Sequence, residues 1–421
     1  MKLTKVGAVA FVAILIAAAC TTGGSPAPGG TGGGASLGTV TIGASDPIHI
    51  AFWGVLSGAD VQLGQDQLTG VKVAVQDKGG KLLDHTIDLG TPEDGLCTPE
   101  GGATAAQKLA ADKSIVALVG PSCSDEVVGG IKALTEAGMT TISGSATRPA
   151  LTNPDRDPSF AGFLRTAHSD AFQGKAVAEF VFNQLKAKTA ATIHDGSAYA
   201  QALQGVFADN FKTLGGTITD QEAVKKDDTD MKPVLTKIST SNSGAAPEAL
   251  YYPIFTAAGG FITAQVRDVP GMDKVALLGS DGLFSPDFVK AAGPNVAGMY
   301  LSSPDFTKFD QAALTKFRDE YKAIAGQDFL QIFHAHAYDA FNIVAAAIEK
   351  VAVKNSDGSL TIDRKALRDA IYATKDFKGI TGTLSCSASG DCGAPVIAVY
   401  QITADVAATP SKIADLKPIW P

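Results

Sequence analysis

The chain has 421 residues, of which 45% are hydrophobic and 19% are charged, with 35 Lys and Arg against 43 Asp and Glu. This length provides for two or three domains with buried cores. The formal net charge of −8 and the lack of a basic block argue against nucleic acid as a partner, because phosphate binding depends on clustered Lys and Arg.

The N-terminus predicts an exported protein with a lipid anchor. Lys2 and Lys5 precede an uncharged apolar run at 6–19, which is too short for a membrane-spanning helix and is typical of a signal peptide. The run ends in three alanines and Cys20, which resembles a bacterial lipobox, where the cysteine is lipidated and becomes the mature N-terminus. The usual lipobox has Leu where Ala17 stands, so an ordinary secretory signal with Cys20 unmodified is the alternative. Residues 1–20 are assigned to the signal peptide.

A flexible tether is predicted between this anchor and a folded body. Residues 21–34 are mostly Gly, Ser, Thr and Pro, so they cannot form a core, and we extend the predicted tether to residue 45. No later stretch of about 18 apolar residues occurs, so the body itself is not expected to span a membrane.

Strand-like and helical patterns then alternate along the chain. The first run has strands at 48–53, 86–89, 115–119 and 140–142, and helices at 65–78, 103–112 and 125–137. After Ser169 the alternation resumes, with helices at 170–185, 199–214 and 257–266 and strands at 189–193, 217–223, 249–252 and 275–278. Helical patterns at 311–324 and 336–351 and a hairpin-like section at 382–402 follow. This order predicts two α/β lobes with parallel sheets and ligands at the carboxyl ends of the strands.

The remaining cysteines, Cys97, Cys123, Cys386 and Cys392, suggest disulfides, because their number is even and the chain is predicted to be exported. Three connectivities are possible. Cys386 and Cys392 flank a turn-rich stretch and could staple a hairpin, which would leave Cys97 to pair with Cys123. A metal site is less favoured, because no Cys-x-x-Cys or nearby His accompanies either pair.

Five short motifs carry a family resemblance. They are Gly54-Val-Leu-Ser-Gly58, Gly120-Pro-Ser-Cys-Ser124, Ile142-Ser-Gly-Ser-Ala-Thr-Arg-Pro149, His194-Asp-Gly-Ser-Ala-Tyr199 and Gly279-Ser-Asp-Gly282. In order and spacing, from about 48 to 402, the chain resembles the leucine/isoleucine/valine-binding protein family, the branched-chain amino-acid receptors of ABC transporters.

The resemblance implies a type I periplasmic-binding-protein fold, in which two doubly wound parallel-sheet lobes are joined by three chain crossings. Lobe 1 would comprise 46–168 and 303–375, and lobe 2 would comprise 169–302 and 376–421. A Cys97–Cys123 disulfide would fall where the family carries one, beside the ligand site.

The resemblance also implies a ligand site shared by the lobes. Ser124, Ser145 and Thr147 would hold the α-carboxylate and α-ammonium of an amino acid, and Ser124 begins a predicted helix whose free N–H groups attract an anion. From lobe 2 come Tyr199, Phe255 and Asp281, and Asp281 would pair with the α-ammonium, with Asp170 as a weaker second acid. Taken singly, Ser124 could be only an N-cap, Tyr199 a partly exposed helix residue, and Asp281 part of a turn.

Several positions of the implied ligand site differ from those of branched-chain amino-acid receptors. Leu63 and Ser122 stand where such receptors tend to carry Tyr and Leu, and Asp281 is shorter than the more familiar Glu. Trp53 and Phe333 are expected to narrow or line the cleft. Ser122 and Ser145 would make the pocket for the ligand's side group more polar than an aliphatic side group requires. The resemblance therefore supports recognition of the amino-acid headgroup more strongly than recognition of a branched-chain side group.

The function that the resemblance implies is that of a monomeric extracytoplasmic lipoprotein that binds an amino acid and passes it to the permease subunits of an ABC importer, without a cofactor or metal. An enzyme is not expected, because His334 and His336 lack the spacing of a zinc pair and no nucleophile elbow or Walker loop occurs. The alternatives are a receptor of the same fold for urea, a short amide or an aromatic carboxylate, and a sensory lipoprotein without a transporter.

Overall fold

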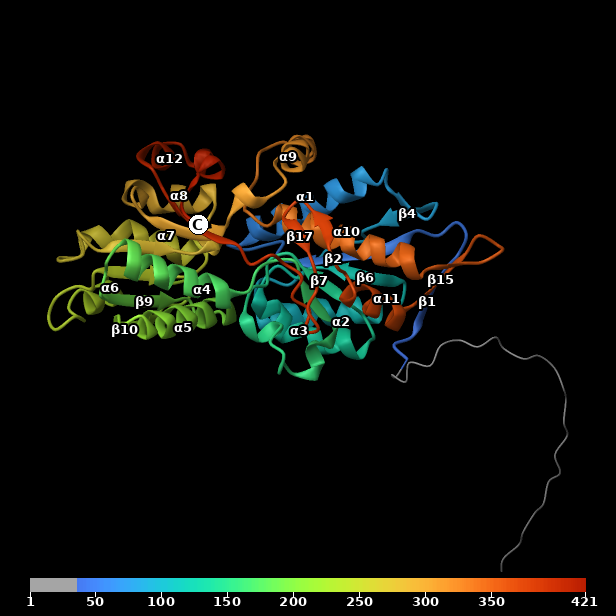
Figure 1. Ribbon diagram of the computed structural model, residues 1–421, viewed down its shortest axis with the longest axis horizontal. Coiled ribbons are helices and arrows are strands. Elements are labelled where there is room, and N and C mark those ends of the chain that lie inside the picture. Colours follow the sequence, from blue (N-terminus) through green and yellow to red (C-terminus); the bar gives the residue numbers. More distant parts are fainter. Residues whose placement is uncertain (1–35) are drawn as a thin grey trace, which may run out of the picture. The chain divides into compact units, whose positions relative to one another are not determined.

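The computed structural model describes residues 36–421 (Figure 1). The predicted signal peptide, Cys20 and most of the predicted tether lie outside the described residues. No helix within residues 36–421 has the length and apolar character needed to cross a membrane.

The first lobe is built on a sheet with the strand order β3-β4-β2-β6-β7-β8, in which β5 also pairs with β2. Every pair is parallel except β3 with β4. All five residues of β6 are buried, as expected for a central parallel strand with both faces covered. The strands are β2 (Ile48–Gly54), β3 (Lys81–Leu82), β4 (His85–Asp88), β5 (Glu93–Asp94), β6 (Ile115–Val119), β7 (Thr141–Ser143) and β8 (Phe163–Arg165).

Helices cover both faces of this sheet (Figure 1). On one face α2 packs against α3, and their residues Leu109 and Ile131 share a core with Leu118. On the other face α1 packs against α10, and Val71 and Phe341 share a core with Val119. The helices of this lobe are α1 (Val61–Asp77), α2 (Pro99–Ala111), α3 (Ser124–Glu136), α9 (Gln311–Ala325), α10 (His334–Val351) and α11 (Arg364–Tyr372).

The second lobe has a sheet with the order β10-β9-β11-β12-β13-β18-β19. The first five strands pair in parallel, whereas β18 pairs antiparallel with both β13 and the edge strand β19, so the predicted sheets are confirmed as mainly but not entirely parallel. The strands are β9 (Thr189–His194), β10 (Thr217–Ala223), β11 (Ala249–Tyr252), β12 (Ala276–Gly279), β13 (Tyr300–Pro304), β18 (Ile397–Gln401) and β19 (Pro418–Trp420).

Two helix pairs enclose the second sheet. Helices α4 and α5 lie over one face and α7 and α8 over the other, which gives the predicted two-lobed α/β architecture (Figure 1). The helices are α4 (Asp170–Glu179), which continues as a π-helix at Phe180–Gln184, α5 (Ala198–Thr213), α6 (Lys232–Ile238), α7 (Thr256–Gln265), α8 (Pro286–Ala292) and α12 (Ala404–Ala408).

The end of the predicted tether belongs to the folded body, which corrects the prediction for 21–45. Strand β1 (Thr39–Ile42) pairs antiparallel with β15 (Leu360–Asp363), which also pairs with β14 (Val353–Lys354). Val40 and Ile42 are buried in the core of the first lobe, whereas Thr39 and Thr41 are exposed. The alternation of buried and exposed side chains in this strand is therefore complete.

The section predicted as a hairpin at 382–402 does not form one. Strand β17 (Gly382–Leu384) pairs with β16 (Phe377–Gly379), while β18 pairs with β13 and β19 in the second lobe. The two strands expected to pair therefore lie in different sheets.

The exact lobe boundaries remain a proposal, and the contacts favour positions that differ from those expected. Strand β13 extends to Pro304 in the second sheet, and Leu384 and Cys392 pack in the core of the first lobe. Arg165 also donates a hydrogen bond to Asp391 at 2.5 Å. We propose that the chain crosses between the lobes after Arg165, after Pro304 and after Cys392.

Two disulfides are present, Cys97–Cys123 and Cys386–Cys392. The first joins the segment before α2 to the segment before α3 over a sequence separation of 26. The second spans 6 positions and closes the turn between β17 and β18. Both pairings agree with the interpretation of the sequence.

Strand β1 should contribute to the stability of the body. Ile42→Ala removes a side chain buried against β15, and we expect it to lower the free energy of unfolding by about 2–4 kcal/mol. Thr41→Ala, in the exposed position of the same strand, serves as the control and should change that free energy by less than about 0.5 kcal/mol. Urea denaturation measures both, and an unchanged midpoint for Ile42→Ala would show that β1 is not part of the folded body.

The two disulfides should differ in their contribution to stability. In the chain-entropy model, the longer loop closed by Cys97 and Cys123 contributes about 3–4 kcal/mol and the shorter loop closed by Cys386 and Cys392 about 2 kcal/mol. Replacing both cysteines of a pair by serine avoids free thiols, and the two double variants can be compared by chemical denaturation. A larger loss for the Cys386/Cys392 variant would contradict this ranking.

Candidate functional site

The predicted site residues follow the carboxyl ends of strands in both sheets. In a parallel sheet these ends share one edge, so side chains that follow different strands meet there. Ser122 and Ser124 follow β6, Ser145 follows β7, Tyr199 follows β9, Phe255 follows β11 and Asp281 follows β12.

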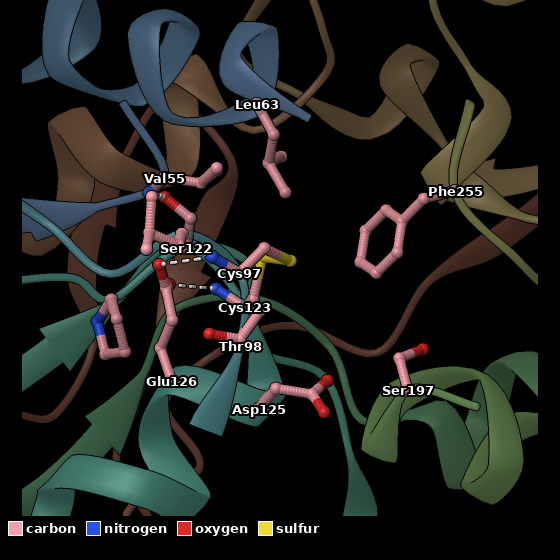
Figure 2. The surroundings of a disulfide bond; sticks show 12 residues. Val55, Leu63, Cys97, Thr98, Ser122, Cys123, Asp125, Glu126, Ser197 and Phe255 are labelled. Carbon is pink, nitrogen blue, oxygen red and sulfur yellow. Dashed lines mark hydrogen bonds between the residues drawn. A yellow bond between two sulfur atoms is a disulfide. The ribbon is translucent and has the colours of Figure 1, made fainter. Parts of the chain in front are cut away.

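These residues surround a cavity with an empty volume of about 340 Å³. Both lobes contribute, with Ser124 and Ser145 from the first and Tyr199 and Asp281 from the second. Figure 2 shows Leu63 of α1 and Phe255 of the second lobe on opposite sides of this space. Eight of the ten residues predicted from the sequence are among the lining, which is Leu63, Ser122, Cys123, Ser124, Ser145, Tyr199, Phe255, Asp281, Gly282, Gln331 and Phe333.

Two predicted residues do not line the cavity. Trp53 is fully buried in the core beneath α2 and α3, so it does not narrow the cleft as expected. Thr147 is also buried, and its carbonyl oxygen accepts a hydrogen bond of 3.0 Å from the Asp170 N–H. Thr147 therefore lies beside Asp170 and outside the cavity wall.

Glycines allow the loop after β6 to approach β2 closely. A Cβ atom on Gly54 would lie 2.4 Å from Ser122 Oγ, and one on Gly120, whose φ is +123°, would lie 1.9 Å from the Trp53 carbonyl oxygen. Any larger side chain would clash at these distances. Ser122 Oγ accepts a hydrogen bond of 3.3 Å from the Val55 N–H, which ties the two strand ends together.

Buried Glu126 supports the disulfide beside the cavity (Figure 2). Its Oε2 atom accepts a hydrogen bond of 2.8 Å from the Cys123 N–H, and its Oε1 atom accepts one of 3.2 Å from the Cys97 N–H. Burial raises the pKa of Glu126 to about 7. One side chain of α3 thus holds both ends of the Cys97–Cys123 bridge, directly before Ser124.

The serine hydroxyls hold the loops of the first lobe in place. Ser124 is the first residue of α3, and its Oγ atom accepts a hydrogen bond of 3.2 Å from the Arg148 N–H, so the alternative of a simple N-cap is wrong. Ser145 Oγ donates to the Ser122 carbonyl oxygen at 2.5 Å. The start of α3 is therefore held against the cavity, which Cys123 and Ser124 line.

Only one carboxylate oxygen of Asp281 accepts hydrogen bonds from residues 36–421. Its side chain is 2% exposed, and its Oδ1 atom accepts hydrogen bonds from the Tyr199 hydroxyl and, at 3.0 Å, from the Gly282 N–H. Its Oδ2 atom lies 3.6 Å from His168 Nε2 and accepts no hydrogen bond from any residue in 36–421. Burial lowers the pKa of His168, while the charge of Asp281 acts in the opposite direction.

Asp170, the first residue of α4, is a second buried acid. Neither of its carboxylate oxygens has a hydrogen-bond partner of good geometry within the described part of the chain, although the Thr147 side chain lies near enough to oppose the rise in its pKa. Asp170 is not among the residues that line the cavity. Burial and the negative charge of Asp281 raise the pKa of Asp170 well above its ordinary value. The neighbouring cation, Arg165, bonds to Asp391. Two acids thus lie close together without a cation bonded to either.

Further contacts join the two lobes near the cavity. Both carboxylate oxygens of Asp125, on α3, lie 3.1 Å from the N–H of Ala198, which begins α5 in the other lobe. Burial raises the pKa of Asp125. Lys226 Nζ donates to the Cys97 carbonyl oxygen at 2.9 Å and lies 5.1 Å from the centre of the Phe255 ring. Sequence reasoning did not identify either contact.

Gln331 is a lining residue that the sequence did not reveal. It lies between α9 and α10, in a segment without a repeating pattern, and its only sequence signal is its nearness to Phe333, which was predicted. Among residues 36–421, no group of three or more His, Cys, Asp or Glu side chains is placed to hold a metal ion.

Comparisons with known proteins agree with this arrangement. A family model described as "Periplasmic binding protein" matches residues 47–406. The "Leu/Ile/Val-binding protein homolog 3" of Brucella melitensis is 27% identical over 87% of this chain and 92% of its own length. The "Leucine-, isoleucine-, valine-, threonine-, and alanine-binding protein" of Pseudomonas aeruginosa is 25% identical over 88% of this chain and 93% of its own length.

Solved structures share the fold. The branched-chain amino acid transporter substrate binding protein of Streptococcus pneumoniae, crystallised with isoleucine, has a TM-score of 0.73 and 25% identity and covers 89% of this chain and all of its own. A solute binding protein of Rhodopseudomonas palustris in complex with benzoate has a TM-score of 0.71 at 19% identity and covers 85% of this chain and 93% of its own. From the family match and the two-lobed architecture, we conclude that this chain belongs to the periplasmic binding protein family, a family of binding proteins and not of enzymes.

Proposed function

We propose that this protein is the solute-binding lipoprotein of an ABC importer and that it binds an amino acid between its two lobes. The amino acids for which the relatives are named, and the isoleucine complex of the similar structure, support an amino acid as the ligand. Residues of both lobes line the same cavity, at the carboxyl ends of the strands.

The observation that carries this proposal is the pair of buried acids. Asp281 keeps one oxygen free of hydrogen bonds from the described residues, and neither oxygen of Asp170 has a partner there. A buried carboxylate needs a cation or a proton, because burial without one is costly. The α-ammonium group of an amino acid is a cation of suitable size, and it would also lower the raised pKa of Asp170.

The other end of the cavity suits the α-carboxylate. The 13-residue helix α3 begins at Ser124 and presents its N-terminus to the cavity. Free N–H groups and the helix dipole favour an anion at this position. The hydroxyls of Ser124 and Ser145 add short polar groups on the same wall.

Binding would be coupled to closure of the cleft. The proposed partners of the carboxylate belong to the first lobe, and the proposed partners of the ammonium, Tyr199 and Asp281, belong to the second. A ligand that contacts both lobes stabilises only the closed arrangement and shifts the population toward it.

An aromatic carboxylate is the second candidate ligand. Phe255 and Phe333 supply aromatic rings in the lining, and a receptor of the same fold holds benzoate. A plain carboxylate would bring no cation to the two acids, however. A thermal-shift panel of amino acids, amides and benzoate separates these classes, since ligand at a hundred times its dissociation constant adds about 2.7 kcal/mol of stability.

Removing Asp281 should discriminate an amino acid from a plain carboxylate. For an amino-acid ligand, Asp281→Ala removes a partner of the buried ammonium, and truncation of such a pair lowers affinity by about 30-fold to several-thousand-fold. For benzoate the same change should be neutral or favourable, because no cation is involved.

Isothermal titration calorimetry of the amino acid that gives the largest thermal shift measures this effect. The exposed Asp273, also in the second lobe, provides the control, and Asp273→Ala should leave the affinity unchanged. Asp281→Asn keeps the size of the side chain and tests the charge alone. A loss below about fivefold for Asp281→Ala would refute the assignment of Asp281 to the ammonium.

The membrane anchor is the remaining part of the proposal. The apolar run before Cys20 and the Gly-rich residues after it support an extracytoplasmic protein that is lipidated at Cys20 and tethered to the membrane. Delivery to permease subunits would then take place at the membrane surface.

Lipidation predicts a simple change in partitioning. Cys20→Ser should move the protein from the detergent phase into the aqueous phase, because a serine at this position cannot accept the lipid. Its ligand affinity should equal that of the unchanged protein, since Cys20 lies outside the residues that form the site. An unchanged protein that already partitions into the aqueous phase would refute the lipoprotein assignment.

A further inference from the structure

Gln331 is a buried polar side chain without a partner at the ligand cavity. It is 8% exposed, and its Oε1 atom is fully buried and has no hydrogen-bond partner within residues 36–421. Native proteins satisfy most buried polar atoms, so an orphan at a cavity indicates a group that a ligand completes.

The neighbours of Gln331 place it at the side-group end of the cavity. Gln331, Leu63 and Phe255 also line a second, adjoining cavity with an empty volume of about 260 Å³, to which Asp60 and Asp287 contribute as well. Gln331 in addition borders a third cavity, lined by residues of α9 and of the second lobe. By contrast, the four residues proposed to contact the amino-acid headgroup, Ser124, Ser145, Tyr199 and Asp281, line only the first cavity. Gln331 is therefore grouped with the residues that face the side chain of the ligand.

The chemistry of an amide limits what this ligand side chain can be. A glutamine amide presents an acceptor on one side and a donor on the other, and a half-turn of its last torsion exchanges them. A hydroxyl donates and accepts, so it pairs with either orientation. Leu63, Phe255 and Phe333 offer apolar surface around the same space. The matching side group is small and combines an apolar part with one hydroxyl.

We propose that Gln331 is a specificity-determining residue that selects an α-amino acid with a hydroxyl-bearing side group of the size of threonine over an aliphatic one. This inference rests on the proposed function, because it takes the headgroup contacts as given. It assigns the preference to a hydrogen bond between the ligand hydroxyl and the Gln331 amide.

The comparison of threonine with valine tests the proposal, because these two amino acids have nearly the same shape and differ by a hydroxyl in place of a methyl group. By calorimetry, the unchanged protein should bind threonine about tenfold more tightly than valine, as one hydrogen bond predicts. Gln331→Leu keeps the approximate size and removes the amide. It should weaken threonine binding by about tenfold and leave valine binding equal or tighter, so the preference disappears.

Gln204 supplies a matched control. It is equally buried, donates from Nε2 to the Glu222 carbonyl oxygen in the second lobe, and is not a lining residue of the ligand cavity or its neighbour. Gln204→Leu should leave the ratio of threonine to valine affinity unchanged even if the protein becomes less stable. Thermal melts of both variants confirm that each is folded at the temperature of the titration.

Two results would overturn the inference while the proposed function stands. One is that the unchanged protein binds valine as tightly as threonine, and the other is that Gln331→Leu keeps the preference for threonine. Binding of benzoate alone, with no response to any amino acid, would instead refute the proposed function and this inference with it.

Discussion

A carboxylate that leaves water must be neutralised, and this requirement organises the second lobe around the cavity. Asp281 is oriented by the Tyr199 hydroxyl and the Gly282 N–H, which both meet one of its oxygens. Asp170, at the start of α4, has no hydrogen-bond partner for its carboxylate in the described chain, and its pKa is raised by burial and by Asp281. No Lys or Arg side chain of residues 36–421 forms an ion pair with either acid. This arrangement is the basis for proposing a ligand with a positively charged group.

The position of this site follows from the topology of the two sheets. Parallel strands bring their carboxyl ends to one edge, so the segments that follow five strands, β6, β7, β9, β11 and β12, contribute side chains to a single cavity. Close packing of the loops depends on positions without a Cβ atom, such as Gly54 and Gly120. The disulfide and Glu126 then fix the loop that begins α3, where the N-terminus of the helix meets the cavity.

Much of this arrangement could be predicted from the sequence, because alternating strand and helix patterns are local and the motifs follow strand ends. Strand β1 was missed because its partner β15 is more than 300 positions away in the chain, and its alternation covers only four residues. The false hairpin arose because pairing between β18 and β13 is decided by tertiary contacts. Asp125 could not be assigned to the site, because its partner Ala198 is 73 positions away in the sequence. Gln331 was missed because it lies between α9 and α10, in a segment without a repeating pattern.

The bond between Asp125 and the Ala198 N–H joins the lobes without involving any ligand atom. Its free energy therefore contributes to the closed form by the same amount for every ligand. A change at Asp125 would scale all affinities by one common factor and leave their order intact. Substitutions of residues that face the ligand side chain would instead change the order of the affinities for different ligands. In this fold, the overall strength of capture and the choice among ligands can thus evolve at different positions, one at the lobe interface and the other in the cavity wall.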